Sequence, residues 1–229
     1  MSDFQEEQKA GLFEGWTAPF INTEKGRKSD TMIPLKGGES VEIVQPIKEK
    51  QKIEAMKKVL RASALRNELL FVLGINTGLR ISDLLGLRIQ DVWTSKNEPA
   101  ERIELKEKKT SKVRHVALNS KSRLLIRQYI EKERHQPAPD EPLFLSQKGG
   151  PISRQHAYDI LNTAARLIGI TDRIGTHSLR KTFGYFAYQQ GTDLAMIQKL
   201  LNHSSQAETL RYIGITQEQM DDVVMRLEL

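Results

Sequence analysis

The sequence predicts a mainly α-helical fold with one small antiparallel β-sheet, and three observations support this prediction. After residue 45, apolar residues recur at helical spacing along most of the chain. Two neighbouring runs, residues 102–105 and 113–118, have the composition of strands, and the polar, lysine-rich segment between them is typical of an exposed hairpin tip. Cap residues and glycines mark where many of the helices begin or end.

The composition bounds the kind of protein. The chain has 229 residues, 38% of them hydrophobic and 28% charged, which is typical of a soluble globular protein. No stretch approaches the roughly 18 uninterrupted apolar residues of a membrane span, and the N-terminus has no secretory signal. The absence of cysteine excludes disulfides, thiolate nucleophiles and cysteine metal sites, and it favours a cytoplasmic location.

Charge is distributed unevenly along the chain. The net charge is +6, but residues 1–45 hold five basic and eight acidic residues, so that residues 46–229 carry +9. A strongly basic domain favours a polyanionic partner such as a nucleic acid.

The two regions also differ in pattern. Residues 1–45 form no sustained helical period, and we interpret them as an irregular arm with a short strand at residues 40–44. Residues 46–229 form the main domain. Its first helix is predicted to begin at Pro46, because proline is tolerated in the first turn, and to bury an apolar stripe. The stripe consists of Ile47, Ile53, Met56 and Leu60.

Further helices follow from apolar spacing and from stop signals. A very apolar helix covers residues 65–75 and ends before Gly78, and a short helix covers residues 81–87. Prolines 137, 139 and 142 force a loop, which a short strand at residues 143–145 follows. The remaining helices are predicted at residues 121–134, 153–167, 178–190, 194–201, 206–212 and 217–227. The last two begin at capping boxes, Ser205 with Glu208 and Thr216 with Gln219.

The residues with the clearest chemistry lie in four short motifs. These are Thr77-Gly-Leu-Arg80, His177-Ser-Leu-Arg180, Leu201-Asn-His203 and a late Tyr212. Two guanidinium groups can neutralise a pentacoordinate phosphate while a phenol attacks it, so the set indicates a phosphodiester site. His177 and Arg180 are three residues apart and would share one helix face.

Each of these residues also has an ordinary structural explanation. His177 and Arg180 could be the exposed start of a helix, and Arg80 could cap the helix before it. Tyr212 could be an amphipathic residue on a helix face, and His203 a loop residue bonded to backbone. The joint occurrence of all five in this order favours the functional interpretation.

With these motifs, the run Thr-Gly-Leu-Arg-Ile-Ser-Asp-Leu-Leu and the cationic hairpin, residues 46–229 resemble the tyrosine recombinase (phage integrase) family. The resemblance implies the tyrosine recombinase catalytic-domain fold and six active-site positions: Arg80, Lys109, His177, Arg180, His203 and Tyr212. Lys109 is preferred within its run because it precedes Thr110 at the turn, and Lys108 is the second choice.

The surrounding sequence both extends the resemblance and departs from it. Asp83 is a candidate to orient the side chain of Arg80 or His177 without contacting the substrate itself. Asn202 stands where the family often has glycine. Most members carry a separate helical DNA-clamping domain before the catalytic one, and residues 1–45 are too short and too irregular to form it.

The resemblance implies a reaction in which Tyr212 attacks a DNA phosphate to give a 3′-phosphotyrosyl link. Arg80 and Arg180 would neutralise the phosphate oxygens, His203 would donate a hydrogen bond, and His177 would act as the base. Lys109 would protonate the leaving 5′-oxygen. No metal and no nucleotide cofactor is expected.

The expected partner is double-stranded DNA, with no role for a membrane. The protein would be a monomer in isolation and a tetramer on DNA, joined through the C-terminal helix. One face of that helix carries Met220, Val223, Val224 and Leu227.

Two alternatives remain open at this point. A type IB topoisomerase uses much the same nucleophile and cations to relax DNA. A non-catalytic helix-turn-helix module at residues 195–213 would account for the charge, but it leaves Arg80, His177 and Arg180 unexplained.

Overall fold

The computed structural model describes residues 32–34, 40–42, 44–106 and 113–227. The chain divides into two compact units, Met1–Val41 and Glu42–Leu229. Near the boundary, β1 (Met32–Pro34) pairs with β2 (Ser40–Glu42) in a two-stranded sheet. The strand predicted at residues 40–44 is therefore present, and it ends at Glu42.

In its described residues the second unit is mainly helical and contains one β-hairpin, which confirms the predicted fold class. Strand β3 (Arg102–Lys106) pairs antiparallel with β4 (Val113–Ala117). A π-helical turn, η1 (Ile130–Arg134), continues α5. The α-helices are α1 (Lys50–Ser63), α2 (Leu65–Thr77), α3 (Ile81–Leu85), α4 (Ile89–Val92), α5 (Ser120–Tyr129), α6 (Arg154–Leu167), α7 (Thr176–Gln189), α8 (Leu194–Leu201), α9 (Gln206–Ile213) and α10 (Gln217–Met225).

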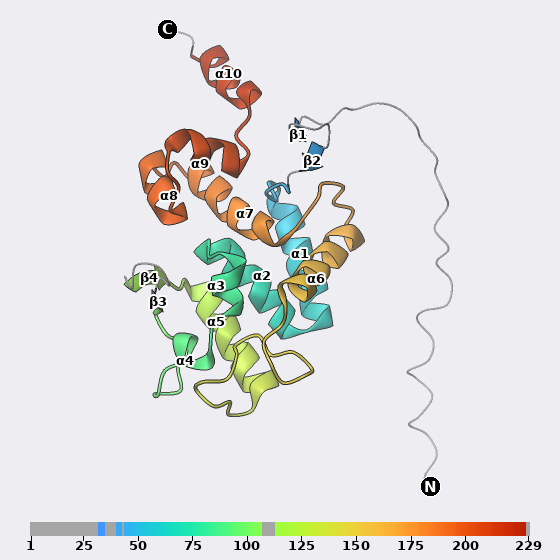
Figure 1. Ribbon diagram of the computed structural model, residues 1–229, viewed down its shortest axis with the longest axis vertical. Coiled ribbons are helices and arrows are strands. Elements are labelled where there is room, and N and C mark those ends of the chain that lie inside the picture. Colours follow the sequence, from blue (N-terminus) through green and yellow to red (C-terminus); the bar gives the residue numbers. More distant parts are fainter. Residues whose placement is uncertain (1–31, 35–39, 43, 107–112, 228–229) are drawn as a thin grey trace, which may run out of the picture. The chain divides into compact units, whose positions relative to one another are not determined.

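Helix α2 lies at the centre of the larger hydrophobic core. Consecutive side chains such as Leu69, Leu70 and Phe71 are all fully buried, so this helix is apolar around its whole circumference. A helix of this kind is stable only when other elements surround it. Helices α1, α5 and α7 pack against it (Figure 1).

A second, smaller core joins α7, α8 and α9. It is formed by Tyr185 of α7, Ile197 and Leu201 of α8, and Ile213 of α9. Gly184 allows α9 to approach closely, because a Cβ atom at this position would lie 2.6 Å from Ile213 Cγ2. This packing brings the His203 loop and the Tyr212 helix beside α7 (Figure 1).

Gly78 ends α2 and turns the chain into α3. Its φ of +61° lies in the left-handed region that favours glycine, and a Cβ atom there would clash with the Phe183 ring of α7. Arg80 follows as the N-cap residue of α3. The glycine therefore fixes where the Arg80 side chain leaves the backbone.

The prediction of a helix start at Pro46 was wrong, since α1 begins at Lys50. The residues before it pack across other helices. The Ile47 amide donates to Thr182 Oγ1 at 2.8 Å, and Lys48 Nζ donates to the Gly214 carbonyl at 3.0 Å. Because these tertiary contacts position the segment, it does not continue the helix.

Two further boundaries differ from the predictions. The helix expected at residues 81–87 ends at Leu85, and the short helix α4 follows it unpredicted. No strand forms at residues 143–145. The Leu143 amide instead donates to the Leu87 carbonyl at 2.8 Å, and Leu145 forms an isolated bridge with Pro151. Single cross-chain bonds of this kind leave no periodic signal in a sequence.

The helix caps follow the predicted residues, with one change of partner. Thr216 and Gln219 form a reciprocal capping box at the start of α10. The Ser205 hydroxyl accepts from the Glu208 amide at 3.1 Å, but the Glu208 carboxylate bonds to the Ser204 amide and hydroxyl instead of closing the box.

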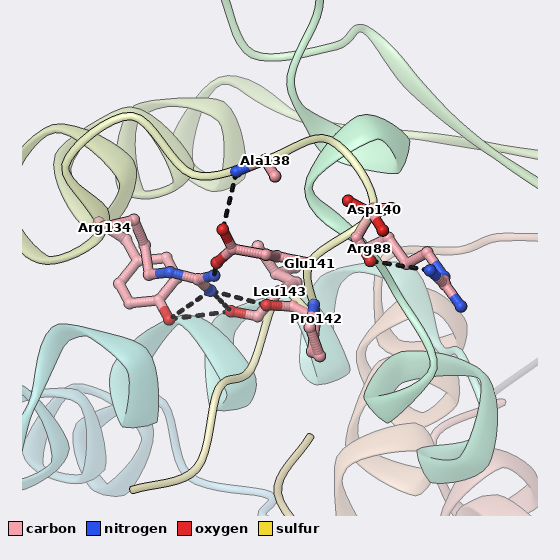
Figure 2. Close-up of polar contacts among 8 residues, drawn as sticks. Arg88, Arg134, Ala138, Asp140, Glu141, Pro142 and Leu143 are labelled. Atoms are coloured by element: carbon pink, nitrogen blue, oxygen red, sulfur yellow. Dashed lines mark hydrogen bonds and ion pairs between the residues drawn. The ribbon is translucent and has the colours of Figure 1, made fainter. Parts of the chain in front are cut away.

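The proline-rich loop after η1 is tied to the body by Arg134 (Figure 2). Its nearly buried guanidinium donates to the carbonyls of Pro142 at 2.7 Å and Leu143 at 2.9 Å, and it pairs with Glu141 at 2.6 Å. The Tyr129 hydroxyl donates to the same Leu143 carbonyl at 2.8 Å, and burial raises the pKa of this phenol. These bonds satisfy loop carbonyls that would otherwise be buried without partners.

Candidate active site

Arg180 connects two loops that are far apart in the sequence. Its side chain projects from α7 and is only 4% exposed. The guanidinium donates to the carbonyl of Gly78, in the turn before Arg80, and to the carbonyl of Leu201, just before the His203 loop. One buried cation therefore holds the motifs that contain Arg80 and His203 against the helix that contains His177.

Tyr212 lies against His203. The two ring centroids are 4.7 Å apart, and the planes meet edge-on at 72°. The His203 ring is held in turn by a hydrogen bond of 3.2 Å between Nδ1 and Thr209 Oγ1. Thr209 is fully buried on α9, one turn before Tyr212. The histidine and the tyrosine are thus positioned by the same helix.

The environment of Tyr212 keeps its phenol protonated in the free protein. Burial is the largest influence and raises the pKa of Tyr212, while the cations of Arg180 and Arg80 and a hydrogen bond from Arg180 act to lower it. An incoming phosphate would displace water from this site and would be attracted by the same cations. A phenol in this environment could attack a phosphate only with the help of a base.

His177 has the protonation state that a base needs. It lies in the first turn of α7, where it is exposed. Loss of hydration lowers the pKa of His177, and the cations of Arg154, Lys181 and Arg180 lower it further. Near neutral pH the imidazole is therefore uncharged and able to accept a proton.

The pKa of His203 is also lowered. Desolvation is the main cause, the charges of Arg180 and Arg80 add to it, and Glu208 opposes it. Since the Thr209 hydroxyl already donates to the Ser205 carbonyl at 3.0 Å, His203 Nδ1 donates to Thr209 Oγ1, and Nε2 is the ring nitrogen left to face a ligand. Nε2 can donate to a phosphate oxygen only in the protonated imidazole, a form that the negative charge of a bound phosphate would favour.

The structure brings Arg80, His177, Arg180, His203 and Tyr212 into one site, as the contacts and mutual electrostatic effects above describe. Arg80 is exposed, whereas Arg180 is buried. Lys109 and Lys108 lie outside the residues that the structure describes.

Asp83 lies half-buried on α3, where its carboxylate accepts a 3.4 Å hydrogen bond from the Ser82 hydroxyl. Its role in orienting Arg80 or His177 stays a prediction. Among the described residues, no group of three or more histidines and carboxylates could hold a metal ion. In the same part of the chain, no helix is both long and apolar enough to cross a membrane.

Two residues of the site were not predicted. Thr209 positions His203, and Lys181 places its Nζ atom 5.2 Å from the centroid of the Tyr212 ring. Lys181 is four residues after His177, so the helical spacing that pairs His177 with Arg180 also puts Lys181 on the same face. That signal was available in the sequence, whereas the Thr209 contact depends on the tertiary fold.

Comparison with known proteins identifies the family. Residues 44–219 match the model of the phage integrase family. The chain belongs to this family. This member is 41% identical over 177 residues to the probable integrase/recombinase YoeC of Bacillus subtilis (strain 168), an alignment that covers 77% of this chain and 92% of that protein.

Longer relatives share only the matched region. The integrase-family chain is 35% identical over 163 residues to tyrosine recombinase XerD of Corynebacterium glutamicum, which covers 69% of this chain and 51% of that protein. It thus spans about half the length of the curated Xer relatives that it matches.

Solved structures show the same fold. The crystal structure of XerA recombinase aligns with a TM-score of 0.67 at 20% identity, covering 90% of this chain and 68% of that one. XerH site-specific recombinase bound to its difH substrate aligns with a TM-score of 0.63 at 24% identity, covering 79% and 52%. These matches confirm the tyrosine recombinase catalytic-domain fold, and they do not favour the topoisomerase or helix-turn-helix alternatives.

Proposed function

We propose that residues 46–229 are the catalytic domain of a site-specific DNA recombinase that breaks and rejoins strands through a 3′-phosphotyrosyl intermediate. The observation that carries this proposal is the pair of bonds from Arg180 to the Gly78 and Leu201 carbonyls. Those bonds gather two guanidinium groups and His203 around the half-buried phenol of Tyr212. This is the arrangement that a tyrosine nucleophile needs at a phosphodiester.

In the proposed reaction, each of the six active-site side chains has one role. Tyr212 Oη bonds to phosphorus while the bond to the 5′-oxygen breaks. His177 accepts the phenolic proton, and Lys109 gives a proton to the departing 5′-oxygen. Arg80, Arg180 and His203 Nε2 would contact the nonbridging oxygens, where negative charge accumulates. The phosphotyrosyl bond conserves the energy of the broken phosphodiester, so religation by a 5′-hydroxyl reverses the same steps.

Double-stranded DNA is the proposed partner. Residues 46–229 carry a net +9, as expected for a surface that follows phosphates. Structural neighbours of the chain include XerH bound to difH and the Tn1549 transposon integrase in complex with DNA. A DNA-acting enzyme of this family would work in the cytoplasm.

We expect the chain to be a monomer in solution and to assemble as a homo-tetramer on DNA. Helix α10 leaves apolar side chains uncovered, with Val223 62% and Val224 73% exposed. Met220 on the same helix and Leu227, just after its end, are also exposed. Burial of these side chains against a neighbouring protomer would join active sites on one DNA complex.

Covalent trapping tests the proposed function. On a nicked duplex, cleavage releases a short fragment that carries the free 5′-hydroxyl. Because this fragment diffuses away, a protein–DNA adduct should accumulate and should survive denaturation. Tyr212→Phe should bind the duplex with parental affinity and form no adduct. An adduct of undiminished yield from the Tyr212→Phe protein would exclude this tyrosine. Strand exchange between two duplexes, compared with relaxation of a supercoiled plasmid, separates a recombinase from a topoisomerase.

A further inference from the structure

Lys181 is a buried cation whose position the proposed reaction does not yet explain. It follows Arg180 on α7, and the residue is only 6% exposed. Its Nζ atom lies over the ring of Tyr212, 5.2 Å from the centroid. Among the described residues, no salt bridge joins Lys181 to a carboxylate. A buried ammonium group without an anionic partner is costly, so its position requires a reason.

The aromatic ring supplies part of that reason. An ammonium group within about 6 Å of a ring centroid is attracted by the negative face of the ring, and the attraction is strongest where water is excluded. When the phenol loses its proton, the ring becomes richer in electrons and the attraction increases. The contact therefore stabilises the phenolate form of Tyr212 more than the phenol form.

We propose that Lys181 is a positioning residue for the nucleophile, which holds the Tyr212 ring in place and stabilises the negative charge that develops on it during attack. The inference rests on the proposed function, in which Tyr212 attacks the DNA phosphate. Lys181 itself forms no bond and transfers no proton in this step. The phenolic proton still passes to His177, and the bond to the 5′-oxygen still breaks.

The charged groups around Lys181 are consistent with this role. His177 and Arg180 lie on its own helix, Arg80 follows α2, and His203 and Tyr212 come from the α8–α9 region. Arg154 of α6 and Lys181 both lower the pKa of His177. The site therefore holds an excess of positive charge, which a phosphate and a phenolate would offset.

Burial also makes the charge of Lys181 depend on pH. Desolvation lowers the pKa of the Lys181 amine below its usual value. The ammonium form is present below that lowered pKa and is lost as the pH rises through it. The support that Lys181 gives to Tyr212 should be lost over the same pH range.

Three substitutions test the inference in the full-length chain. Lys181→Met keeps an unbranched side chain but removes the charge, Lys181→Arg keeps the charge, and Lys57→Met is a control. Lys57 is less buried than Lys181, with a side chain that is 18% exposed, and it lies on α1, where it pairs with Glu54 at 2.7 Å. Removal of a buried charge in favour of an apolar chain of similar size is often neutral for stability, and thermal melting checks that each variant folds.

The first measurement is the single-turnover rate of adduct formation on the nicked duplex at saturating DNA. Loss of a desolvated cation–π contact should slow Lys181→Met by about 3- to 30-fold. DNA affinity should stay at the parental value, because the contact is with the nucleophile. Lys181→Arg should keep most of the rate, and Lys57→Met should keep all of it. A Lys181→Met protein that cleaves at the parental rate would overturn the inference while leaving the proposed function intact.

The second measurement does not depend on activity. With 4-fluorophenylalanine at position 212, the fluorine NMR signal reports on groups that lie against the ring without titrating itself. A titration step from the Lys181 amine should appear and should be lost with Lys181→Met, whereas a step from His203 should remain in that variant. If no titration step is lost with Lys181→Met, Lys181 does not contact this ring and the inference fails, whatever the cleavage assays show.

Discussion

At the scale of single residues, the two arginines of the site differ in how the protein holds them. Arg180 is buried and donates to two backbone carbonyls, whereas Arg80 is exposed at the start of α3. Arg180 therefore contributes to folding in addition to the phosphate binding that we propose for it. In the described part of the chain, the Arg80 side chain donates no such hydrogen bond to a backbone carbonyl. It can therefore bind a ligand without loss of a structural contact.

Alanine at each position should separate the two tasks. Arg180→Ala leaves the Gly78 and Leu201 carbonyls without donors, at a cost of about 1–3 kcal/mol each. It should also slow adduct formation by about 10²–10³-fold. Arg80→Ala should slow adduct formation by a similar factor while changing the free energy of unfolding by less than about 0.5 kcal/mol. Urea unfolding and the covalent trapping assay measure both effects. Equal destabilisation by the two substitutions would contradict this division.

At the scale of elements, the sequence was sufficient where a signal is local and insufficient where tertiary contacts decide. Apolar spacing predicted α2, and a glycine marked its end. The Thr216 capping box predicted the start of α10. The start of α1 was misplaced because Ile47 and Lys48 bond to residues more than 130 positions away. The π-helical turn before His135 gave no periodic signal that distinguishes it from α-helix.

In the candidate site, too, local motifs were predictable and tertiary contacts were not. The positions of Arg80, His177, Arg180, His203 and Tyr212 were predicted from motifs and their resemblance to a family. The bonds of Arg180 to backbone carbonyls were not predictable, because they depend on how two distant loops meet α7.

Gly78 offers a test of how one turn controls both folding and the site. Gly78→Ala should destabilise the protein twice, through its positive φ and through the clash with Phe183. Gly149 is a matched control, since its φ is +83° but a Cβ atom there meets nothing within 4 Å. Gly149→Ala should cost about 1 kcal/mol, and Gly78→Ala clearly more. Urea unfolding compares the two, and similar losses would mean that the Phe183 contact adjusts without cost.

At the scale of the whole molecule, charge and the exposed tail suggest two separate modes of association. The +9 of residues 46–229 favours salt-sensitive binding to phosphates by each protomer. The apolar face of α10 favours contacts between protomers. The two modes should respond to different substitutions.

The tail can be tested without removing it. Val223→Asp combined with Val224→Asp places charge at side chains that are 62% and 73% exposed, so the fold should be unaffected. On a duplex with two sites, this variant should bind as a single protomer with parental affinity but form fewer multimeric complexes in gel-shift and sedimentation experiments. Leu167→Asp, at a side chain that is 70% exposed on α6, is the control. Normal assembly of the double variant would mean that α10 has no role in joining protomers.

The segment before α1 determines how a force on the N-terminal side of the chain would be transmitted. The Gln45 amide donates to the Arg173 carbonyl at 3.1 Å, and Lys48 donates to the carbonyl that ends the Tyr212 helix. The Gln45 backbone and the Lys48 side chain are thus bonded to other parts of the fold before the chain enters α1. A pulling force applied upstream of residue 45 would therefore load the contacts before α7 and at the end of α9, the helix that carries Tyr212, before it reached the central helix α2.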